Sequence, residues 1–388
     1  MTVAASPRNV YVDMLRGISI LLVMLLHYSL TYRLQFSPLQ QLASVPTLRA
    51  IFLNGNYGVS IFFVISGFLI TANIVRRYGS LAGTDVLHFY KLRLFRLYPS
   101  VVLALLAITV LGVAGLGSFA NVKQGQDLGN GFFVVADLSV LTFWHNILMA
   151  KVGYFNYAMN IYWSLSVEEV FYLLYPLVLV MARRSWMLFV LACVAMVVGP
   201  YYRSIHSDDE VLYLYGNLAC VDMLVYGCAA AIAAARVKWT PMQRYVLAVL
   251  SLVFMGRVYM DGIPGNEAFG ATLMGIGAAV FLTAVATLPA NRIIDGLGRP
   301  LAWLGAHSYE LYLFHILVLG LLREVIPRTG MSPGMKLPML LGFLLVSSLM
   351  AWVVARYYGD PLNRWLRGRF ASRKTIRQPV LTEPGNPA

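Results

Sequence analysis

Residues 13–32 of the chain read DMLRGISILLVMLLHYSLTY, and this stretch decides the fold. Between Arg16 and His27 it holds no charged side chain. At about 1.5 Å per residue, a helix of this length is roughly 30 Å long, which matches the hydrocarbon thickness of a bilayer. The stretch therefore predicts a membrane-spanning helix near the N-terminus, and we expect it to be retained rather than cleaved as a signal peptide.

The composition of the whole chain agrees with that prediction. The 388 residues are 59% hydrophobic and 12% charged, with a mean hydropathy of +0.69. A soluble domain carries about 25% charged residues, so this composition excludes a cytosolic enzyme, a nucleic-acid-binding module and a disordered scaffold. The net charge of +13 is then expected from Lys and Arg in cytoplasmic loops. We predict an integral membrane protein in contact with membrane lipid and without a nucleic-acid partner.

Apolar runs along the chain predict an all-α fold, a polytopic bundle of about ten transmembrane helices. The expected spans are residues 13–32, 57–75, 97–116, 163–182, 186–202, 212–235, 242–260, 268–288, 306–325 and 338–358.

One further apolar stretch, residues 131–150, contains Asp137, His145 and Asn146. If it does not cross and the N-terminus is cytoplasmic, the inner segments hold more than twice as many Lys and Arg as the outer ones. A full crossing would remove that asymmetry. The positive-inside rule therefore predicts ten spans, two cytoplasmic termini, and a re-entrant or interfacial segment at 131–150.

We expect one membrane domain over residues 1–370, because no loop is long enough for a folded soluble domain. The polar, proline-containing residues 371–388 are expected to form a disordered cytoplasmic tail. The three cysteines lie in apolar stretches without metal-ligand spacing, so no metal site is predicted. Asp222 and Arg257 lie on consecutive spans and are expected to form a structural pair.

Two ionisable residues share one face of the first span. Arg16 and His27 are eleven residues apart, which places them about 20° apart around a helix and roughly 16 Å apart along it. An ionisable group within a span usually faces the bundle interior or a wet cavity. His27 is therefore a candidate base, and the alternative is a hydrogen bond between helices.

A second pair of cations, Arg93 and Arg96, has i, i+3 spacing, so both guanidinium groups lie on one side of a helix. Such planar donors at a membrane edge suit a phosphate. The alternative is ordinary positive-inside charge. Arg16 is expected on the same side of the membrane, which favours a shared anion site.

Two adjacent acids, Glu168 and Glu169, open the span that begins near Trp163. Ser166 and Glu169 fit the S-x-x-E pattern of a capping box, which gives Glu169 a structural role. Glu168 has no such role and is the functional candidate.

Small and polar residues within two other spans complete the candidates. Ser66 and Gly67 lie in the middle of one span, where the alternative is close helix packing. In the segment that begins at Ser308, His315 follows Tyr312 by about one helical turn.

Taken together, these motifs resemble those of the acyltransferase-3 family of membrane O-acyltransferases. The matching pieces, in family order, are Arg16-x10-His27, residues 58–68 (GVSIFFVISGF), Arg93-x-x-Arg96, residues 163–168 (WSLSVE) followed by Phe171-Tyr172, and residues 308–315 (SYELYLFH).

The resemblance implies a one-domain transferase that moves an acyl group, commonly acetyl from acetyl-CoA, to a hydroxyl. The acceptor would be a glycan, a lipid-linked saccharide or a glycosylated small molecule at a bacterial inner membrane. Such transfer needs a base, and His27 would supply it. The expected CoA-phosphate ligands are Arg16, Arg93 and Arg96. Glu168 would orient the imidazole or bind a sugar hydroxyl.

The expected pocket residues are Ser66, Trp163, Tyr309, Tyr312 and His315. No cysteine or Gly-x-Ser-x-Gly nucleophile occurs at the site, which favours direct transfer over a covalent intermediate.

The competing hypothesis is a proton-coupled transporter or an exporter of an envelope precursor. Its proton relay would comprise His27, Glu168, Glu310 and His315. Transporters often contain inverted repeats, and the sequence shows none, so this hypothesis ranks second. A flippase-like or purely binding role ranks third.

Overall fold

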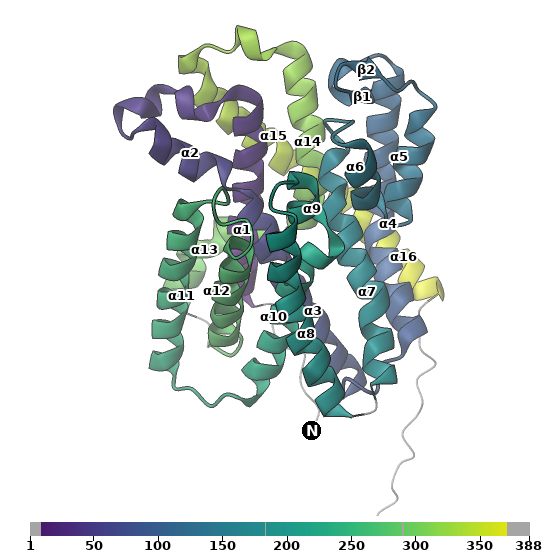
Figure 1. The fold of residues 1–388 in the computed structure, drawn as a ribbon, viewed down its shortest axis with the longest axis vertical. Coiled ribbons are helices and arrows are strands. Elements are labelled where there is room, and N and C mark those ends of the chain that lie inside the picture. Colours follow the sequence, from purple (N-terminus) through teal and green to yellow (C-terminus); the bar gives the residue numbers. More distant parts are fainter. Residues whose placement is uncertain (1–8, 183, 289–290, 371–388) are drawn as a thin grey trace, which may run out of the picture.

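The computed structural model describes residues 9–182, 184–288 and 291–370, and helices dominate it (Figure 1). The α-helices are α1 (Val10–Tyr32), α2 (Val45–Leu53), α3 (Asn56–Tyr78), α4 (Val86–Val113), α5 (Phe132–Leu141), α6 (His145–Val152), α7 (Trp163–Met181), α8 (Ser185–Ile205), α9 (Glu210–Tyr215), α10 (Asn217–Arg236), α11 (Pro241–Asp261), α12 (Gly270–Val285), α13 (Arg292–Ala306), α14 (Ser308–Val325), α15 (Lys336–Val354) and α16 (Asp360–Phe370).

The remaining regular elements are short. Strands β1 (Val122–Lys123) and β2 (Gln126–Asp127) form an antiparallel hairpin in which Val122 pairs with Asp127. A π-helical turn at Ala355–Gly359 joins α15 to α16. Single 3₁₀ turns lie at Leu34–Phe36, Pro38–Gln41, Gly117–Phe119, Asn160–Tyr162, Arg328–Gly330 and Pro333–Met335.

The fold class is confirmed, because within the described ranges seven helices are long and apolar enough to cross a membrane. An eighth candidate is the pair of α13 and α14, which bend by 69° at His307. Helices α11 and α12 coincide with two further expected spans but fall outside this set, and α12 has only 16 residues. The chain is thus a multi-pass α-helical membrane protein, and the number of ten spans stays a prediction. The expected tail, 371–388, lies outside the described residues.

The ambiguous segment 131–150 consists of two short helices, α5 and α6, of 10 and 8 residues. By the helical rise they are about 15 and 12 Å long, so neither alone reaches across a hydrocarbon core of about 30 Å. Phe143 separates them with a φ of 65°, a left-handed conformation that ends α5. Both helices lie at the end of the molecule that carries the β-hairpin (Figure 1). That the segment stays on one side of the bilayer remains a prediction.

Glycines bring the central helices into backbone contact. A Cβ atom on Gly17 of α1 would collide with the carbonyl of Leu301 in α13, and Gly305 of α13 packs as closely against Asp13. Gly67 of α3 meets the backbone of α10 in the same way. Lipid tails are as apolar as the helices, so such close van der Waals packing is what holds them together. Gly67 therefore has the packing role that was one alternative for the Ser66-Gly67 pair.

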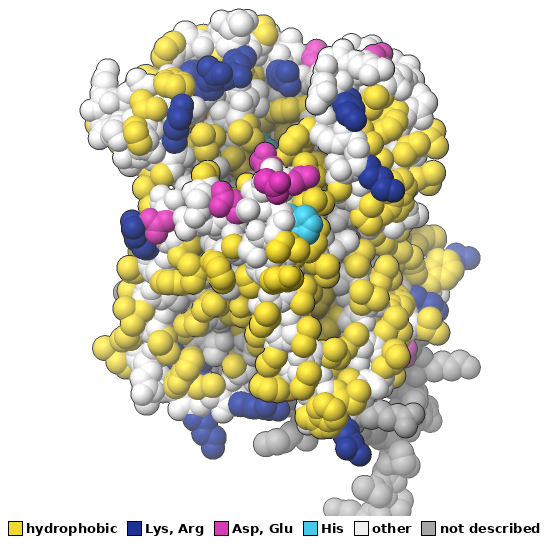
Figure 2. All heavy atoms as spheres, viewed as in Figure 1, with side chains coloured by type: hydrophobic (Ala, Val, Ile, Leu, Met, Phe, Trp, Pro, Cys, Tyr) yellow, Lys and Arg dark blue, Asp and Glu magenta, His cyan; other side chains and the backbone are white. Residues whose placement is uncertain are grey.

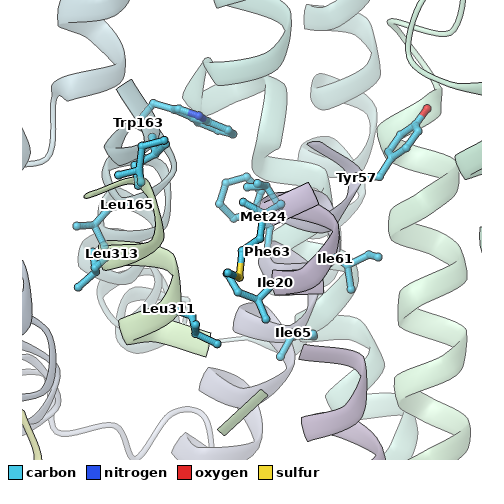
Figure 3. Close-up of a cluster of buried hydrophobic side chains, with 14 of the residues drawn as sticks. Ile20, Met24, Tyr57, Ile61, Phe63, Ile65, Trp163, Leu165, Leu311 and Leu313 are labelled. Carbon is cyan, nitrogen blue, oxygen red and sulfur yellow. The ribbon is translucent and has the colours of Figure 1, made fainter. Parts of the chain in front are cut away.

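Buried hydrophobic side chains from α1, α3, α7 and α14 meet at the centre of the bundle (Figure 3). Ile20, Phe63 and Leu311 are examples, each 2% exposed or less. The outer faces are also apolar. Figure 2 shows hydrophobic side chains over the middle and lower part of one face, and α8 contributes exposed Phe189 and Val197. The apolar exterior suits lipid, and the packed interior fixes the helices that carry the candidate residues.

Candidate active site

A cavity of about 400 Å³ lies among α1, α3, α4, α7, α14 and α16. Many of the polar side chains that line it are cationic. The lining arginines are Arg16, Arg76, Arg77, Arg93, Arg96 and Arg367. Four of these belong to the end of α3 and the start of α4, and Arg16 lies in the first turns of α1. The lining thus combines these cations with apolar side chains such as Phe63 and Leu313.

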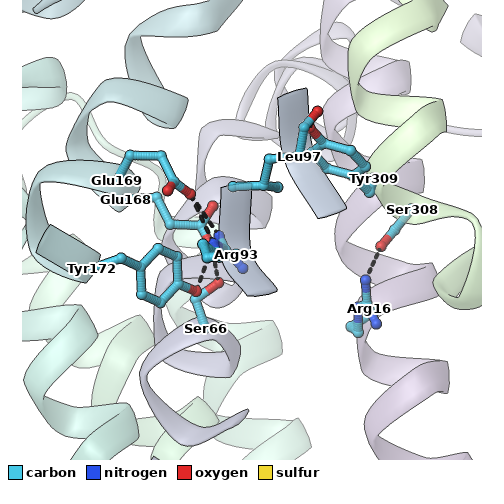
Figure 4. A network of polar contacts seen from close by, with 9 residues as sticks. All are labelled: Arg16, Ser66, Arg93, Leu97, Glu168, Glu169, Tyr172, Ser308 and Tyr309. Atoms are coloured by element: carbon cyan, nitrogen blue, oxygen red, sulfur yellow. Dashed lines mark hydrogen bonds and ion pairs between the residues drawn. The ribbon is translucent and has the colours of Figure 1, made fainter. Parts of the chain in front are cut away.

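One wall of the cavity carries a carboxylate cluster built around Arg93 (Figure 4). Arg93 Nε and Nη2 donate to Glu169 Oε1 at 3.0 and 2.8 Å, and Nη2 also donates to Glu168 Oε1 at 3.2 Å. The guanidinium lies over the ring of Tyr172, 3.7 Å from its centroid. Arg93 is therefore neutralised by two carboxylates and held in place by an aromatic ring.

This cluster corrects the expected capping role of Glu169. Helix α7 begins at Trp163 without a side-chain cap, and Ser166 Oγ instead accepts from the backbone N–H of His145 at 3.1 Å. Glu169 is buried and bonds Arg93 of another helix. The S-x-x-E pattern occurs here inside a helix, where it has no free N–H groups to cap.

Glu168 differs from Glu169 because half of its carboxylate is open. Its Oε1 accepts from Ser66, from Tyr172 at 2.7 Å and from Arg93. Its Oε2 has no hydrogen-bond partner among the described residues, is not buried, and belongs to a side chain that lines the cavity. Glu168 thus presents a free acceptor atom to whatever occupies the cavity.

The opposite wall is formed by α1 and the start of α14. Arg16 Nη2 donates to Ser308 Oγ at 2.8 Å, and Arg16 also lies 3.8 Å from Asp13 (Figure 4). Tyr309 lines the cavity with its ring and donates its hydroxyl to the carbonyl of Leu97 at 2.8 Å. These contacts tie α1, α4 and α14 together around the cavity.

In the lining of the cavity, Tyr312 and Ser164 form a polar contact between α14 and α7. Tyr312 donates to the carbonyl of Ile161 at 2.7 Å, and Ser164 Oγ lies 2.5 Å from the Tyr312 oxygen and 3.3 Å from the same carbonyl oxygen. The ring of His315 lies 6.0 Å from that of Tyr312, centroid to centroid. Tyr312, which lines the cavity, therefore lies beside the second histidine.

The two histidines of the spans contact each other. His27 Nδ1 lies 2.9 Å from His315 Nε2, across 288 positions of sequence. His315 is fully buried, whereas His27 keeps some exposed surface. Neither histidine lines the cavity, although Tyr312 does.

The structure thus divides the expected site residues into groups. Seven line the cavity: Arg16, Ser66, Arg93, Arg96, Glu168, Tyr309 and Tyr312. His27 and His315 form a separate pair. Trp163 stacks on Tyr215, with ring centroids 4.4 Å apart, and borders a second cavity of only about 30 Å³.

Two expectations about Glu168 and His27 do not match these contacts. Glu168 bonds Ser66, Tyr172 and Arg93, and the side chain in contact with the His27 imidazole is His315. The proposed relay of the transporter hypothesis is likewise divided, because Glu168 and the histidine pair belong to separate contact groups.

Sequence reasoning missed Arg76, Arg77 and Arg367, and it quoted Tyr172 within a family motif without assigning it a role. The arginines were visible as basic residues, but their charge was attributed to membrane topology. Tyr172 lies one turn after Glu168, and that spacing was a signal for the hydrogen bond.

Comparisons with known proteins identify a family and several relatives. Residues 9–357 match the family described as an acyltransferase domain, the acyltransferase-3 family. The chain is 26% identical over 344 residues to the O-acetyltransferase OatA of Staphylococcus aureus, covering 82% of this chain and 54% of that one. It is 27% identical over 289 residues to YrhL of Bacillus subtilis, a protein provisionally named a peptidoglycan O-acetyltransferase. That match covers 68% of this chain and 44% of the relative.

The chain therefore spans about half the length of these relatives. No solved structure matches it. In the described parts of the chain, no group of three His, Cys, Asp or Glu residues could hold a metal ion. The family match covers nearly the whole sequence, including α1, α3, α4, α7 and α14, which carry the histidine pair and most of the cavity lining, and the chain accordingly belongs to the acyltransferase-3 family.

Proposed function

We propose that this protein is a membrane O-acetyltransferase that moves an acetyl group from acetyl-CoA to a hydroxyl of a glycan or glycan precursor. The observation that carries the proposal is a cavity whose arginine-rich region leads to Tyr312, beside the histidine pair. Support also comes from the family and from the names of the two relatives, one of which mentions peptidoglycan. Lipid-linked saccharides and glycosylated small molecules are acceptors of the same chemistry.

The donor would bind with its phosphates at the arginines. Arg76 and Arg77 are exposed cations without an acidic partner among the described residues, and Arg96 is exposed with Glu169 and Glu310 in its electrostatic surroundings, so charge in this region is available to a polyanion. Arg93 is already paired with two carboxylates, and we assign it to holding Glu168 rather than to a phosphate. A volume of about 400 Å³ is within the usual range of small-molecule sites and suits the pantetheine arm and thioester.

The reaction would be a direct transfer. His27 takes the proton of the acceptor hydroxyl, and the hydroxyl oxygen attacks the thioester carbonyl. A C–O bond forms, the C–S bond breaks, and CoA leaves as a thiolate that takes up a proton. The negative charge that develops on the carbonyl oxygen needs a hydrogen-bond donor, and Tyr312 or Ser164 would supply it by turning its hydroxyl from its present acceptor to the substrate. Glu168 Oε2 would accept a hydrogen bond from the bound substrate.

We place the protein in a bacterial inner membrane with both termini cytoplasmic, so that the arginines face the cytoplasmic pool of acetyl-CoA. Topology reporters fused at Gly125 and Asn156 should both give the outer side, and opposite sides would contradict this orientation.

The proposal is tested with the purified protein in lipid nanodiscs and acetyl-CoA labelled in its acetyl group. We expect saturable donor binding that CoA competes for and acetate does not. In cells, removing the gene should lower the mass of the surface glycans by acetyl-sized steps. Absence of donor binding together with unchanged glycan masses would overturn the proposal.

A further inference from the structure

We propose that His315 is a positioning residue that fixes the tautomer of His27, keeping the proton on Nδ1 and leaving Nε2 as the basic nitrogen. The consequence for catalysis rests on the proposed function. The tautomer itself follows from hydrogen-bond geometry alone.

Nδ1 of His315 lies on the side of the ring away from His27 and contacts two backbone carbonyls. This nitrogen lies 2.9 Å from the carbonyl oxygen of Leu311 and 2.9 Å from that of Tyr312. A carbonyl oxygen can only accept a hydrogen bond, so Nδ1 of His315 must carry a proton. Both carbonyls belong to the same helical turn of α14, so the backbone sets this arrangement.

The protonation state of His315 Nε2, the nitrogen that faces His27, follows from that of its Nδ1. A neutral imidazole with a proton on Nδ1 has a bare Nε2, which can only accept. His315 is fully buried and none of the described carboxylates contacts it, so a doubly protonated, charged ring would lack compensation there. The partner 2.9 Å away is His27 Nδ1, which must therefore donate.

A proton on Nδ1 of His27 determines the state of its other ring nitrogen, Nε2. When Nδ1 of a neutral imidazole carries the proton, Nε2 holds the free lone pair and is the atom that can take a proton from a hydroxyl. His27 also keeps exposed surface, while the ring of His315 has none. The buried histidine thus holds the ring from behind and leaves its basic side accessible.

The same contact would act during the reaction. When His27 Nε2 takes the acceptor proton, the ring becomes a cation whose Nδ1–H still donates to His315 Nε2. A hydrogen bond from a charged donor is stronger than one from a neutral donor, so the contact stabilises the charged form as it develops. An acidic residue commonly fills this role, and here a neutral histidine fills it.

The tautomer is tested by nitrogen NMR on the full-length protein, labelled with ¹⁵N-histidine and held in nanodiscs. The chain has six histidines, and the signals lost in His27→Ala identify those of His27. We expect His27 Nε2 to give an unprotonated signal and Nδ1 a protonated one. In His315→Ala only the Val23 carbonyl, among the described residues, remains as an acceptor beside the His27 ring, so the share of the other tautomer should rise. In His315→Gln the side-chain amide oxygen can accept from Nδ1, so the original tautomer should return in part.

A protonated Nε2 in the wild-type protein would overturn the assignment, and this measurement needs no variant of His315. An unchanged His27 spectrum in a folded His315→Ala protein would overturn the role of His315.

Kinetics test the catalytic consequence. His315→Ala should lower kcat about 10- to 100-fold, as when a histidine loses its orienting partner, and leave KM for acetyl-CoA unchanged. His315→Gln should recover part of the loss. The control is His206→Ala, on the loop after α8, which should retain normal turnover. Normal kcat in a His315→Ala protein with mixed tautomers would overturn the catalytic role.

If the NMR result holds while the wild-type protein transfers no acetyl group, the proposed function fails and the tautomer assignment stands.

Discussion

Two of the arginine–carboxylate clusters in the described part of the chain join separate helices, and they differ in how fully their polar atoms are paired. In the first, Arg203 of α8 bonds Asp222 of α10 through both Nη atoms, at 3.0 and 2.8 Å. In the second, Arg93 bonds Glu168 and Glu169. Both join separate helices, and both remove charge from an apolar interior.

The Arg203 cluster is saturated. Besides Asp222, the guanidinium donates to the carbonyls of Ala268 and Ala219 and to Thr272, which accounts for its N–H groups. Thr272 in turn donates to Asp222 at 2.7 Å. Arg203 is 1% exposed and Asp222 is fully buried. A cluster with no unused donor or acceptor has a structural role.

The expected pairing of Asp222 with Arg257 was wrong. Arg257 is exposed and pairs with Asp261 on its own helix at 2.7 Å. Arg203 lies near the end of α8, and its sequence gave no sign that it would reach α10.

The Arg93 cluster is open by contrast. The side chains of Arg93 and Glu168 keep about a fifth of their surface exposed, and Glu168 Oε2 faces the cavity without a partner among the described residues. An unpaired acceptor next to a cavity can bind a ligand, whereas a saturated pair cannot. The comparison therefore assigns stability to one cluster and substrate contact to the other.

The largest effect should come from His27, on the functional side of this comparison. His27→Ala should lower kcat by about 10²–10⁴-fold, because a general base is lost. Acetyl-CoA should still bind, since the arginines at the cavity are unchanged. Turnover and donor affinity of the purified variant are the measurements. Near-normal turnover would remove His27 as the base.

Asp222→Ala should have a large effect on stability, although Asp222 has no role in catalysis. Removing one partner leaves the Arg203 charge buried and unpaired, which costs about 3–5 kcal/mol. We expect loss of folded protein in detergent, measured by thermal unfolding and size-exclusion chromatography. Arg257→Gln, at the exposed pair, is the control and should melt normally. A stable Asp222→Ala protein would end the structural assignment.

A smaller effect should come from Glu168→Gln, which keeps the shape and removes the charge. We expect kcat to fall about 10- to 100-fold, as for the loss of a hydrogen bond to a charged group worth about 1.5–3 kcal/mol. The melting temperature should change little, because the open carboxylate is not needed for packing. Glu210→Gln, an exposed acid of α9, is the control. An unchanged kcat, or a large loss of stability, would show that the Arg93 cluster is structural, like the Arg203 cluster.

The smallest effect is expected for the exposed arginines. Replacing Arg76 and Arg77 together with Gln should weaken acetyl-CoA binding about 3- to 10-fold, because each exposed charge contributes up to about 1 kcal/mol. Added salt should reduce the difference in acetyl-CoA affinity between the variant and the wild type, because it screens the charges. Binding is measured by titration at two salt concentrations, with kcat at saturating donor expected to stay normal. Equal affinities at low salt would assign this charge to topology alone.

The sequence by itself determined the fold class and most of the candidate site residues. Long apolar runs have few solutions other than helices in a bilayer, so each expected span overlaps helix in the structure, although 212–235 is divided between α9 and α10. Local spacing also singled out Arg16, His27 and Glu168, because ionisable residues are rare within spans.

Only the tertiary structure decided which of these residues meet. His27 and His315 are 288 residues apart, and Arg93 and Glu169 are 76 apart. Helical periodicity sets the face on which a residue lies but not the helix that packs against that face. Here, glycines at helix crossings determine the packing, because they let backbones approach closely enough for side chains of distant helices to bond. The choice between Glu168 and Glu169, and the partner of each histidine, follow from that packing.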